Sequence, residues 1–283
     1  MDRATVRAML ERELASAVEI ANGAGRILME IYASDFDVAF KEGNSPVTIA
    51  DTRANAYIVE QLRSLFPQDG IVAEENKDHG DALSRERCWF VDPLDGTKEF
   101  IAKNGEFAVM IGLSIGGEAK LGVVLQPGKD KLYSGIVGQG AYLTHAGQTQ
   151  ALHVSDKVRP EQLKLVVSRS HRDKTTDEVV KRLGIVDEFC SGSVGLKIGI
   201  ISEQTADLYV HASDKASKWD ACGPEAVVRA AGGRFSDISG AAFDYRESDL
   251  RTSRGILACN AAAYDAVLPV VREVLQESGF LKG

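Results

Sequence analysis

The chain has 283 residues, of which 44% are hydrophobic, and its formal net charge is −8. This length and apolar content can form a full hydrophobic core in one large or two medium domains. The negative charge argues against a nucleic-acid polymer as the main partner, because polyphosphate backbones are bound by surplus Lys and Arg. A small anion stays compatible with this charge if metal ions lie between that anion and the protein's carboxylates.

The cysteines and the apolar runs bear on where the protein works. The four cysteines form no CxxC pair, which predicts free thiols and no zinc site. Acidic residues such as Glu11 and Glu19 interrupt the N-terminal stretch, so no signal peptide is expected. No run approaches the ~18 apolar residues of a membrane-spanning helix. We expect a cytoplasmic protein without a transmembrane segment; peripheral attachment to the inner membrane and a homodimeric state are left open.

The first half of the chain is predicted to be α+β. Apolar residues at helical spacing predict a long first helix, and Thr48 is suited to cap a second one. Short apolar runs predict strands, and the later runs are separated by glycine-containing turns. The predicted elements are helices at about 4–33 and 48–66, strands at 70–73 and 88–91, and an antiparallel sheet over 107–143.

After Pro160 the pattern changes to short strands that alternate with helical stretches, which is typical of an α/β arrangement. The strands are expected at 163–168, 206–210, 232–238 and 254–260, and the helices near 173–183, 194–203, 221–231 and 261–277. We place a domain boundary near residue 155. The prediction is an α/β protein with an α+β domain over 1–155 and an α/β domain over 156–283.

Acidic residues follow the two predicted strands of the first half. Glu74 comes directly after the strand at 70–73, and Asp92 directly after the strand at 88–91. Asp92 and Asp95 are separated by two residues, and Pro93 stiffens the intervening turn. Both carboxylates and the Leu94 carbonyl can therefore point into one small volume. Such hard oxygen ligands select Mg²⁺, Mn²⁺ or Ca²⁺ over softer metals.

Two further features extend this site. Gly96 permits a tight turn, which leaves the Gly96 and Thr97 amides at a helix N-terminus suited to a phosphate. Asp220 lies just before a predicted helix and can supply a ligand from the second half. An isolated Asp-Gly pair is usually only a turn, and an isolated Asp before a helix is usually a cap. The run DPLDGT is more specific, because few structural needs require its residues together.

The set AEE, DPLDGT and WD, followed by a helix ending in GG, resembles the inositol monophosphatase superfamily of Mg²⁺-dependent, lithium-inhibited phosphatases. The stretch DPLDGTKEFIAKNGEFAV, with NSPVTIAD before it and VVSRSH after it, is similar to the 3′(2′),5′-bisphosphate nucleotidase branch. The resemblance implies a layered α/β/α/β/α sandwich, and two or three Mg²⁺ per site. The implied metal ligands are Glu74, Asp92, the Leu94 carbonyl, Asp95 and Asp220.

The resemblance also implies a mechanism and a substrate. Glu74 and Thr97 would act on the attacking water, with Asp51 near that water or a third, weaker metal. Glu74, the Leu94–Thr97 segment and Asp220 would contact the substrate. The substrate would be a small nucleotide bisphosphate, adenosine 3′,5′-bisphosphate, converted to AMP. Its second phosphate or base is expected to meet Arg169, His171 and Lys197. Val194-Gly195-Leu196 replace the hydroxyl residues that relatives tend to have before that Lys, which puts hydroxyl contacts there in doubt.

Three alternatives remain open at this stage. One is inositol monophosphatase or fructose-1,6-bisphosphatase activity on the same fold, against which the segment KEFIAKNGEF counts. A haloacid-dehalogenase-type phosphatase has a DxDGT motif that forms an aspartyl-phosphate, whereas two residues separate the aspartates here. The third is a non-catalytic regulator that binds metal or nucleotide.

Overall fold

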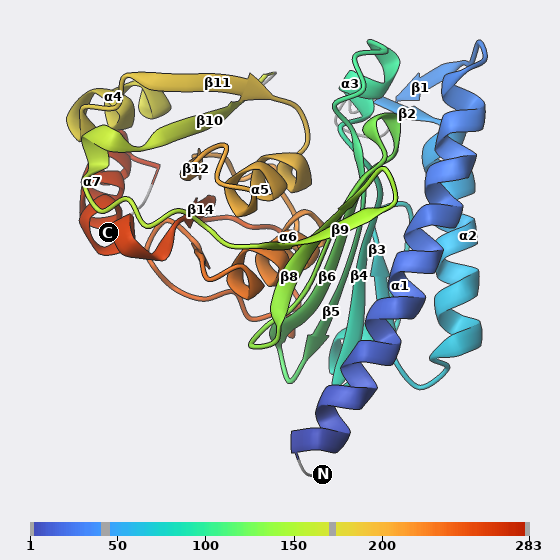
Figure 1. Ribbon diagram of the computed structural model, residues 1–283. Coiled ribbons are helices and arrows are strands. Elements are labelled where there is room, and N and C mark those ends of the chain that lie inside the picture. The colour runs from blue at the N-terminus through green and yellow to red at the C-terminus, as the bar shows by residue number, and fades with distance from the viewer. Residues whose placement is uncertain (1–2, 41–45, 170–173, 281–283) are drawn as a thin grey trace.

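The computed structural model describes residues 3–40, 46–169 and 174–280. Its elements stack in five layers (Figure 1). The first layer holds α1 (Arg3–Tyr32) and α2 (Ile49–Leu65), which lie along one face of a large sheet. Both helices agree with the sequence prediction, including Thr48 as the cap of α2, whose hydroxyl accepts a hydrogen bond from the Ala50 amide.

The second layer is a seven-stranded sheet with the order β3-β4-β5-β6-β7-β8-β9. β3 and β4 are parallel, and every later neighbour is antiparallel, as predicted for 107–143. The strands are β3 (Gly70–Ala73), β4 (Arg87–Asp95), β5 (Ala108–Ile115), β6 (Glu118–Gln126), β7 (Lys131–Ile136), β8 (Gly140–His145) and β9 (Gln148–Leu152). The short helix α3 (Thr97–Ile101) follows β4, and a separate two-stranded sheet joins β1 (Val38–Phe40) to β2 (Pro46–Thr48).

The other three layers come from the second half of the chain. α5 (Val194–Ser202) and α6 (Lys218–Ala230) lie between the sheets, and α4 (Lys174–Leu183) and α7 (Ala261–Glu277) cover the outer face of the second sheet (Figure 1). That sheet has the order β11-β10-β12-β14-β13. Its strands are β10 (Lys164–Ser168), β11 (Asp187–Ser191), β12 (Leu208–His211), β13 (Arg234–Ser236) and β14 (Ile256–Cys259). The predicted layered α/β/α/β/α sandwich is confirmed.

Buried apolar clusters fill the spaces between the layers. α1 and α2 bury residues such as Leu28 and Ile58 against Trp89 of the first sheet, and α4 and α7 bury Val179 and Val267 against the second. The inner helices contribute to clusters on both of their sides. Short 3₁₀ turns complete the chain at Ala82–Ser84, Pro127–Lys129 and Pro160–Gln162.

Glycines let α6 approach the first sheet closely. A Cβ at Gly112 would lie 2.4 Å from the Gly223 nitrogen, and a Cβ at Gly122 would lie 2.0 Å from the Gly223 oxygen. Both distances are shorter than a carbon contact allows, so a larger residue at either position would push the helix away. This contact brings the first turn of α6 toward the end of β4.

Several boundaries differ from the sequence prediction. β4 does not end at Val91 but continues to Asp95 through a register shift between Asp92 and Asp95, because Asp95 pairs with Ala108 of β5. The expected Pro-stiffened turn is thus a bulge in a strand. α6 begins at Lys218, so Asp220 lies within its first turn and Pro224 lies inside the helix. The short strands β1, β2 and β11 were not predicted.

The chain passes from the first sheet to the second between Leu152 and Lys164. α6 belongs to the second half of the chain but packs on the first sheet, so buried clusters contain residues from both sides of residue 155. The domain boundary near residue 155 stays a prediction. Across the part of the chain that the structure describes, none of the helices combines the length and apolarity needed to cross a bilayer.

Candidate active site

Three aspartates from two distant segments meet at one point. Asp92 and Asp95 lie at the bulged end of β4, and Asp220 lies in the first turn of α6. Each offers a carboxylate oxygen that is within 4.8 Å of those of the other two. Asp92 is buried, and the other two are half-buried. Carboxylates in such a group repel one another, so their convergence needs an explanation beyond packing.

Glu74 faces the same space from the neighbouring strand. It follows β3, which is parallel to β4, so the carboxyl ends of both strands open on the same side. Glu74, Asp92, Leu94, Asp95 and Asp220 all line one cavity of about 260 Å³. The structure therefore brings together all five of the metal ligands expected from the sequence, while the role of each stays a prediction.

Hydrogen bonds from both halves of the chain hold the aspartates. Asp92 Oδ1 accepts a hydrogen bond from the Leu94 amide at 2.9 Å, as expected inside the bulge. Asp95 Oδ2 accepts one from the Ser193 hydroxyl at 2.5 Å and one from the Gly195 amide at 3.0 Å, both at the start of α5. Asp220 Oδ2 accepts one from the Ser217 amide at 2.6 Å in a capping box.

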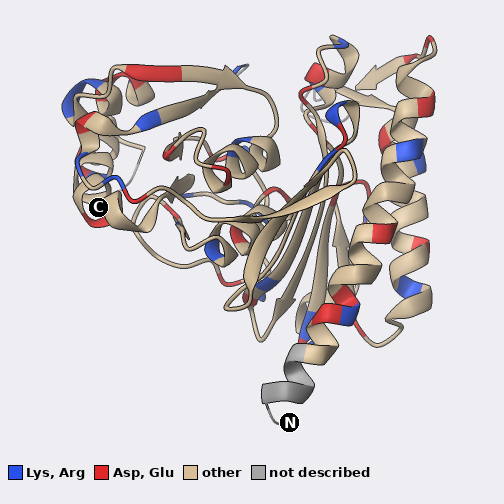
Figure 2. Ribbon diagram, viewed as in Figure 1, with Lys and Arg blue, Asp and Glu red and all other residues tan. Residues whose placement is uncertain are grey.

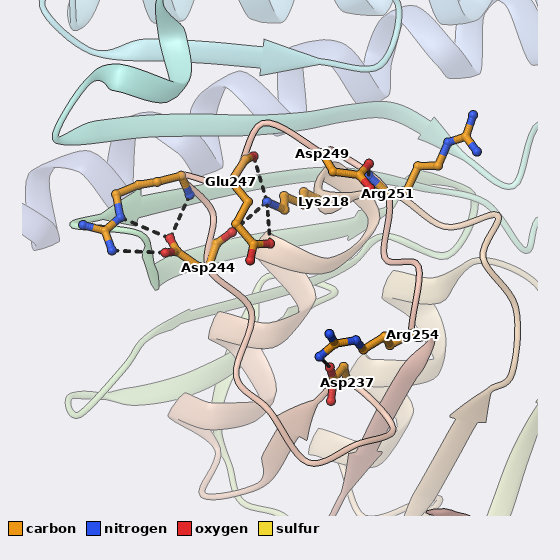
Figure 3. Close-up of polar contacts among 8 residues, drawn as sticks. Lys218, Asp237, Asp244, Glu247, Asp249, Arg251 and Arg254 are labelled. Atoms are coloured by element: carbon orange, nitrogen blue, oxygen red, sulfur yellow. Dashed lines mark hydrogen bonds and ion pairs between the residues drawn. The ribbon is translucent and has the colours of Figure 1, made fainter. Parts of the chain in front are cut away.

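Asp220 lies in the first turn of α6. A loop braces Lys218 of the same turn (Figure 3). Lys218 is 1% exposed, and its ammonium donates to the carbonyl oxygens of Asp244 at 2.7 Å and Glu247 at 2.9 Å. The Lys218 amide donates to the Leu250 carbonyl at 2.8 Å. A positive charge is unfavourable near a helix N-terminus, because that end of the helix dipole is itself positive. The two carbonyl oxygens replace the hydrogen bonds to water that the buried ammonium has lost.

Asp51 and Thr97 form a second polar group at the site. The Thr97 hydroxyl donates to Asp51 Oδ1 at 3.0 Å and lies 3.3 Å from the Leu94 carbonyl oxygen. Asp51 Oδ2 accepts from the amide and the hydroxyl of Thr48, at 2.7 and 2.8 Å. Thr97 lines the cavity together with Gly96, whose φ of +95° is a backbone conformation that favours glycine.

The carboxylates are held in an environment that opposes their charge. Burial, followed by repulsion from Glu74 and Asp95, raises the pKa of Asp92 well above its ordinary value. Burial and then repulsion from Asp95 and Glu74 raise the pKa of Asp220 to about 8. A cation in the cluster would stabilise the ionised carboxylates and so lower the pKa values of Asp92 and Asp220. The hard oxygen donors and their unbalanced charge thus fit a divalent metal ion such as Mg²⁺.

Without a metal ion, stability should fall as pH rises. An aspartate whose pKa is higher in the folded state keeps its proton there while the unfolded chain loses it, so the folded state binds more protons. For Asp220 the window runs from its ordinary 3.8 to about 8. We expect the melting temperature in EDTA to decrease from pH 5 to pH 8.5.

The Asp220→Asn variant removes this titrating group together with the repulsion that Asp220 exerts on Asp92. Its melting temperature in EDTA should exceed that of the wild type at pH 8.5, with a smaller difference at pH 5. Differential scanning fluorimetry measures both. Equal pH dependence of the two proteins would contradict the assigned environment.

The cationic residues expected at the substrate end have different surroundings. Lys197 lines the cavity from α5 and is 2% exposed; its ammonium donates to the Ser193 carbonyl at 2.5 Å and lies 5.0 Å from the Tyr209 ring centroid. Arg169 does not line the cavity, and its guanidinium pairs with Glu106 at 2.7 and 2.8 Å. His171 lies outside the described residues. The predicted contacts of all three with substrate stay predictions.

Other lining residues were missed. Ser193, one position before Val194, brings a hydroxyl to the site, where it donates to Asp95, and the doubt about hydroxyl contacts with substrate at Val194-Gly195-Leu196 is untouched by this contact. His211 lines the cavity from the end of β12, and Ser213 and Lys215 line it from the segment between β12 and α6. Their signal in the sequence is the polar run directly before WD, to which the sequence analysis gave no role.

The outer helices α1 and α2 carry charged residues of both signs (Figure 2). Along α1 and α2 acidic residues alternate with basic ones, so neither helix presents a continuous basic stripe (Figure 2). This distribution is consistent with a small anion as the ligand.

The model of the inositol monophosphatase family matches residues 9–276. The chain belongs to the inositol monophosphatase family. The family predicted from AEE, DPLDGT and WD is thereby confirmed, and the haloacid-dehalogenase alternative is excluded.

Individual members of the family differ in their similarity to the chain. It is 38% identical to the 3′(2′),5′-bisphosphate nucleotidase CysQ of Escherichia coli strain K12 over 239 residues, which are 82% of this chain and 94% of that protein. The crystal structure of CysQ from Bacteroides thetaiotaomicron has a TM-score of 0.75 and 30% identity, covering 89% of this chain and 97% of the other. The Thermotoga maritima IMPase has a TM-score of 0.79 and 26% identity, covering 94% and 99%.

Proposed function

We propose that the protein is a Mg²⁺-dependent 3′(2′),5′-bisphosphate nucleotidase that hydrolyses the 3′-phosphate of adenosine 3′,5′-bisphosphate to give AMP and phosphate. The observation that carries this proposal is the 38% identity to a nucleotidase across 94% of that relative, against 26% for the inositol monophosphatase structure. Each of the two alignments spans most of both chains. The higher identity therefore indicates the nucleotidase branch and does not result from a short aligned region.

The polarity of the cavity supports a substrate with two anionic groups. Its lining includes the carboxylates of Glu74, Asp92 and Asp220 and also the side chains of Lys197 and Lys215. A phosphate that is neutralised by metal ions fits the carboxylates, and a second anion fits the lysines. Tyr209 adds an aromatic surface near Lys197.

The residues that would hold two or three Mg²⁺ are Glu74, Asp92, the Leu94 carbonyl, Asp95 and Asp220, with Asp51 nearby for a third ion. When bound, Mg²⁺ supplies Lewis acidity that lowers the pKa of water and neutralises charge on the transferring phosphoryl group. The bulge in β4 and the braced first turn of α6 fix where these ligands lie.

The protein's own groups would handle the proton. The Thr97 hydroxyl donates its hydrogen to Asp51, so a lone pair on Thr97 Oγ1 can accept a hydrogen bond from the attacking water. Glu74 lines the same cavity and can accept from the second hydrogen of that water. Burial raises the pKa of Asp51, which makes it a better proton acceptor than an exposed aspartate.

Lys197 should distinguish the bisphosphate from a simple phosphate ester. We expect Lys197→Met to lower kcat/KM about 10- to 100-fold for adenosine 3′,5′-bisphosphate, which corresponds to ~1–3 kcal/mol for a charge-assisted hydrogen bond. Phenyl phosphate lacks the second anion and should lose less than about threefold. Burial lowers the pKa of Lys197 to about 8, so the wild-type preference should decline as pH rises through that value. Equal losses on both substrates would contradict this role.

The product tests the proposed reaction. Adenosine 3′,5′-bisphosphate with Mg²⁺ should yield AMP with its phosphate on the 5′ position, identified by ³¹P NMR. EDTA should abolish phosphate release, and Li⁺ should inhibit it. Release of the 5′-phosphate instead, or turnover that persists in EDTA, would contradict the proposal. The non-catalytic alternative predicts no phosphate release.

A further inference from the structure

Ser193 has an unusual backbone for a residue with a side chain. Its φ is +55° and its ψ is 134°, a combination that favours glycine, and it caps the N-terminus of α5. Such conformations cost free energy and persist where surrounding contacts impose them, often at functional sites. Ser193 also lines the cavity that holds the carboxylates.

The hydroxyl and the carbonyl oxygen of Ser193 both form hydrogen bonds. The hydroxyl accepts a hydrogen bond from the Leu196 amide at 3.1 Å, which satisfies the helix cap. Its hydrogen is therefore available to Asp95, whose Oδ2 lies 2.5 Å away. The Ser193 carbonyl accepts from the Lys197 ammonium at 2.5 Å. Ser193 thus connects a carboxylate of β4 to α5, across 98 positions of sequence.

The preceding residue is held from the first half of the chain. The Gly192 amide donates to Glu106 Oε2 at 2.7 Å, and Glu106 is itself paired with Arg169. A Cβ at Gly192 would lie 2.6 Å from the Glu106 carbonyl oxygen, so the two segments are in direct contact. This contact fixes the chain on which Ser193 projects toward Asp95.

We propose that Ser193 is a positioning residue for Asp95, an inference that rests on the metal site of the proposed function. Its hydroxyl and the Gly195 amide both donate to Oδ2, so they set the rotation of the carboxylate that would hold the cation. A helix cap alone does not require this contact. Partners of a metal ligand orient it, and their removal typically weakens metal affinity about 10- to 100-fold.

Ser193→Gly separates this role from a structural one. Glycine tolerates the positive φ and is an adequate cap, so the variant should keep its unfolding free energy in EDTA, while it loses the hydroxyl. We expect its dissociation constant for Mg²⁺, measured by isothermal titration calorimetry, to rise about 10- to 100-fold. Ser193→Ala should show the same rise in that constant, with lower stability. Activity lost by either variant should return in part at high Mg²⁺.

Gln204→Gly is the matched control. Gln204 also has a positive φ, of +62°, and follows the other end of α5 at an exposed position. It should gain or keep stability and bind Mg²⁺ like the wild type. Wild-type Mg²⁺ affinity in both Ser193 variants would overturn the role of Ser193, as would an equal loss in Gln204→Gly. Failure of the wild type to bind Mg²⁺ would contradict the proposed function itself and this role with it.

Discussion

Asp95→Asn should lower kcat/KM with Mg²⁺ by about 10³-fold, or ~4 kcal/mol of transition-state stabilisation. Asparagine keeps the shape of the side chain, and its amide oxygen can still accept from Ser193 or Gly195. It removes one negative charge from the group that would hold the cation. The loss should come with weaker Mg²⁺ binding.

The same substitution should stabilise the metal-free protein. Burial raises the pKa of Asp95, which means that its ionised form opposes folding at neutral pH. Lower activity with a higher melting temperature in EDTA is the signature of a ligand in a repulsive cluster. Asp130→Asn, the same chemical change at an exposed loop residue, should alter neither property. Near-wild-type kcat/KM in purified Asp95→Asn would show that the metal site is misassigned.

Thr97→Val is expected to have the next largest effect. Valine has nearly the same shape, but it cannot accept a hydrogen bond from water or donate one to Asp51. Positioned proton transfer typically contributes 10²- to 10⁴-fold, so we expect kcat to fall about 10²- to 10³-fold. Mg²⁺ affinity should change little, because Thr97 is not among the proposed ligands.

Thr97→Ser supplies the matched comparison. It keeps the hydroxyl and removes only a methyl group, so it should retain most of the wild-type kcat. Stopped assays at saturating substrate and Mg²⁺ compare the three proteins. If valine and serine lower kcat equally, the hydroxyl has no part in the reaction and Thr97 serves packing.

The sequence was sufficient to predict helices and strands where local signals and tertiary contacts favour the same structure. Thr48 caps α2, the run 70–73 is a strand, and the helix over 261–277 has its predicted bounds. The carboxylates of DPLDGT could be grouped because they are close in sequence. Asp220 could be named as a candidate ligand from its place before a helix, but its assignment to the same metal site rested on the family resemblance, since no local signal brings β4 and α6 together.

The sequence predictions were wrong or incomplete where contacts between residues far apart in the sequence determine the local structure. β4 extends to Asp95 because Ala108 pairs with it beyond a bulge, and α6 starts early because the loop through Asp244 and Glu247 holds Lys218. Ser193 was overlooked because its partner lies far away in sequence. The pairing of Arg169 with Glu106 likewise depends on tertiary structure, which spacing in the sequence does not reveal.

The central claim is that this site hydrolyses a nucleotide bisphosphate. It is tested most directly by kcat/KM for adenosine 3′,5′-bisphosphate, inositol 1-phosphate and fructose 1,6-bisphosphate under one Mg²⁺ concentration. The metal site would accept any terminal phosphate, so selectivity must come from the second anion and the base. We predict the highest kcat/KM for adenosine 3′,5′-bisphosphate, by at least about 100-fold. A preference for inositol 1-phosphate or fructose 1,6-bisphosphate would contradict the nucleotidase assignment.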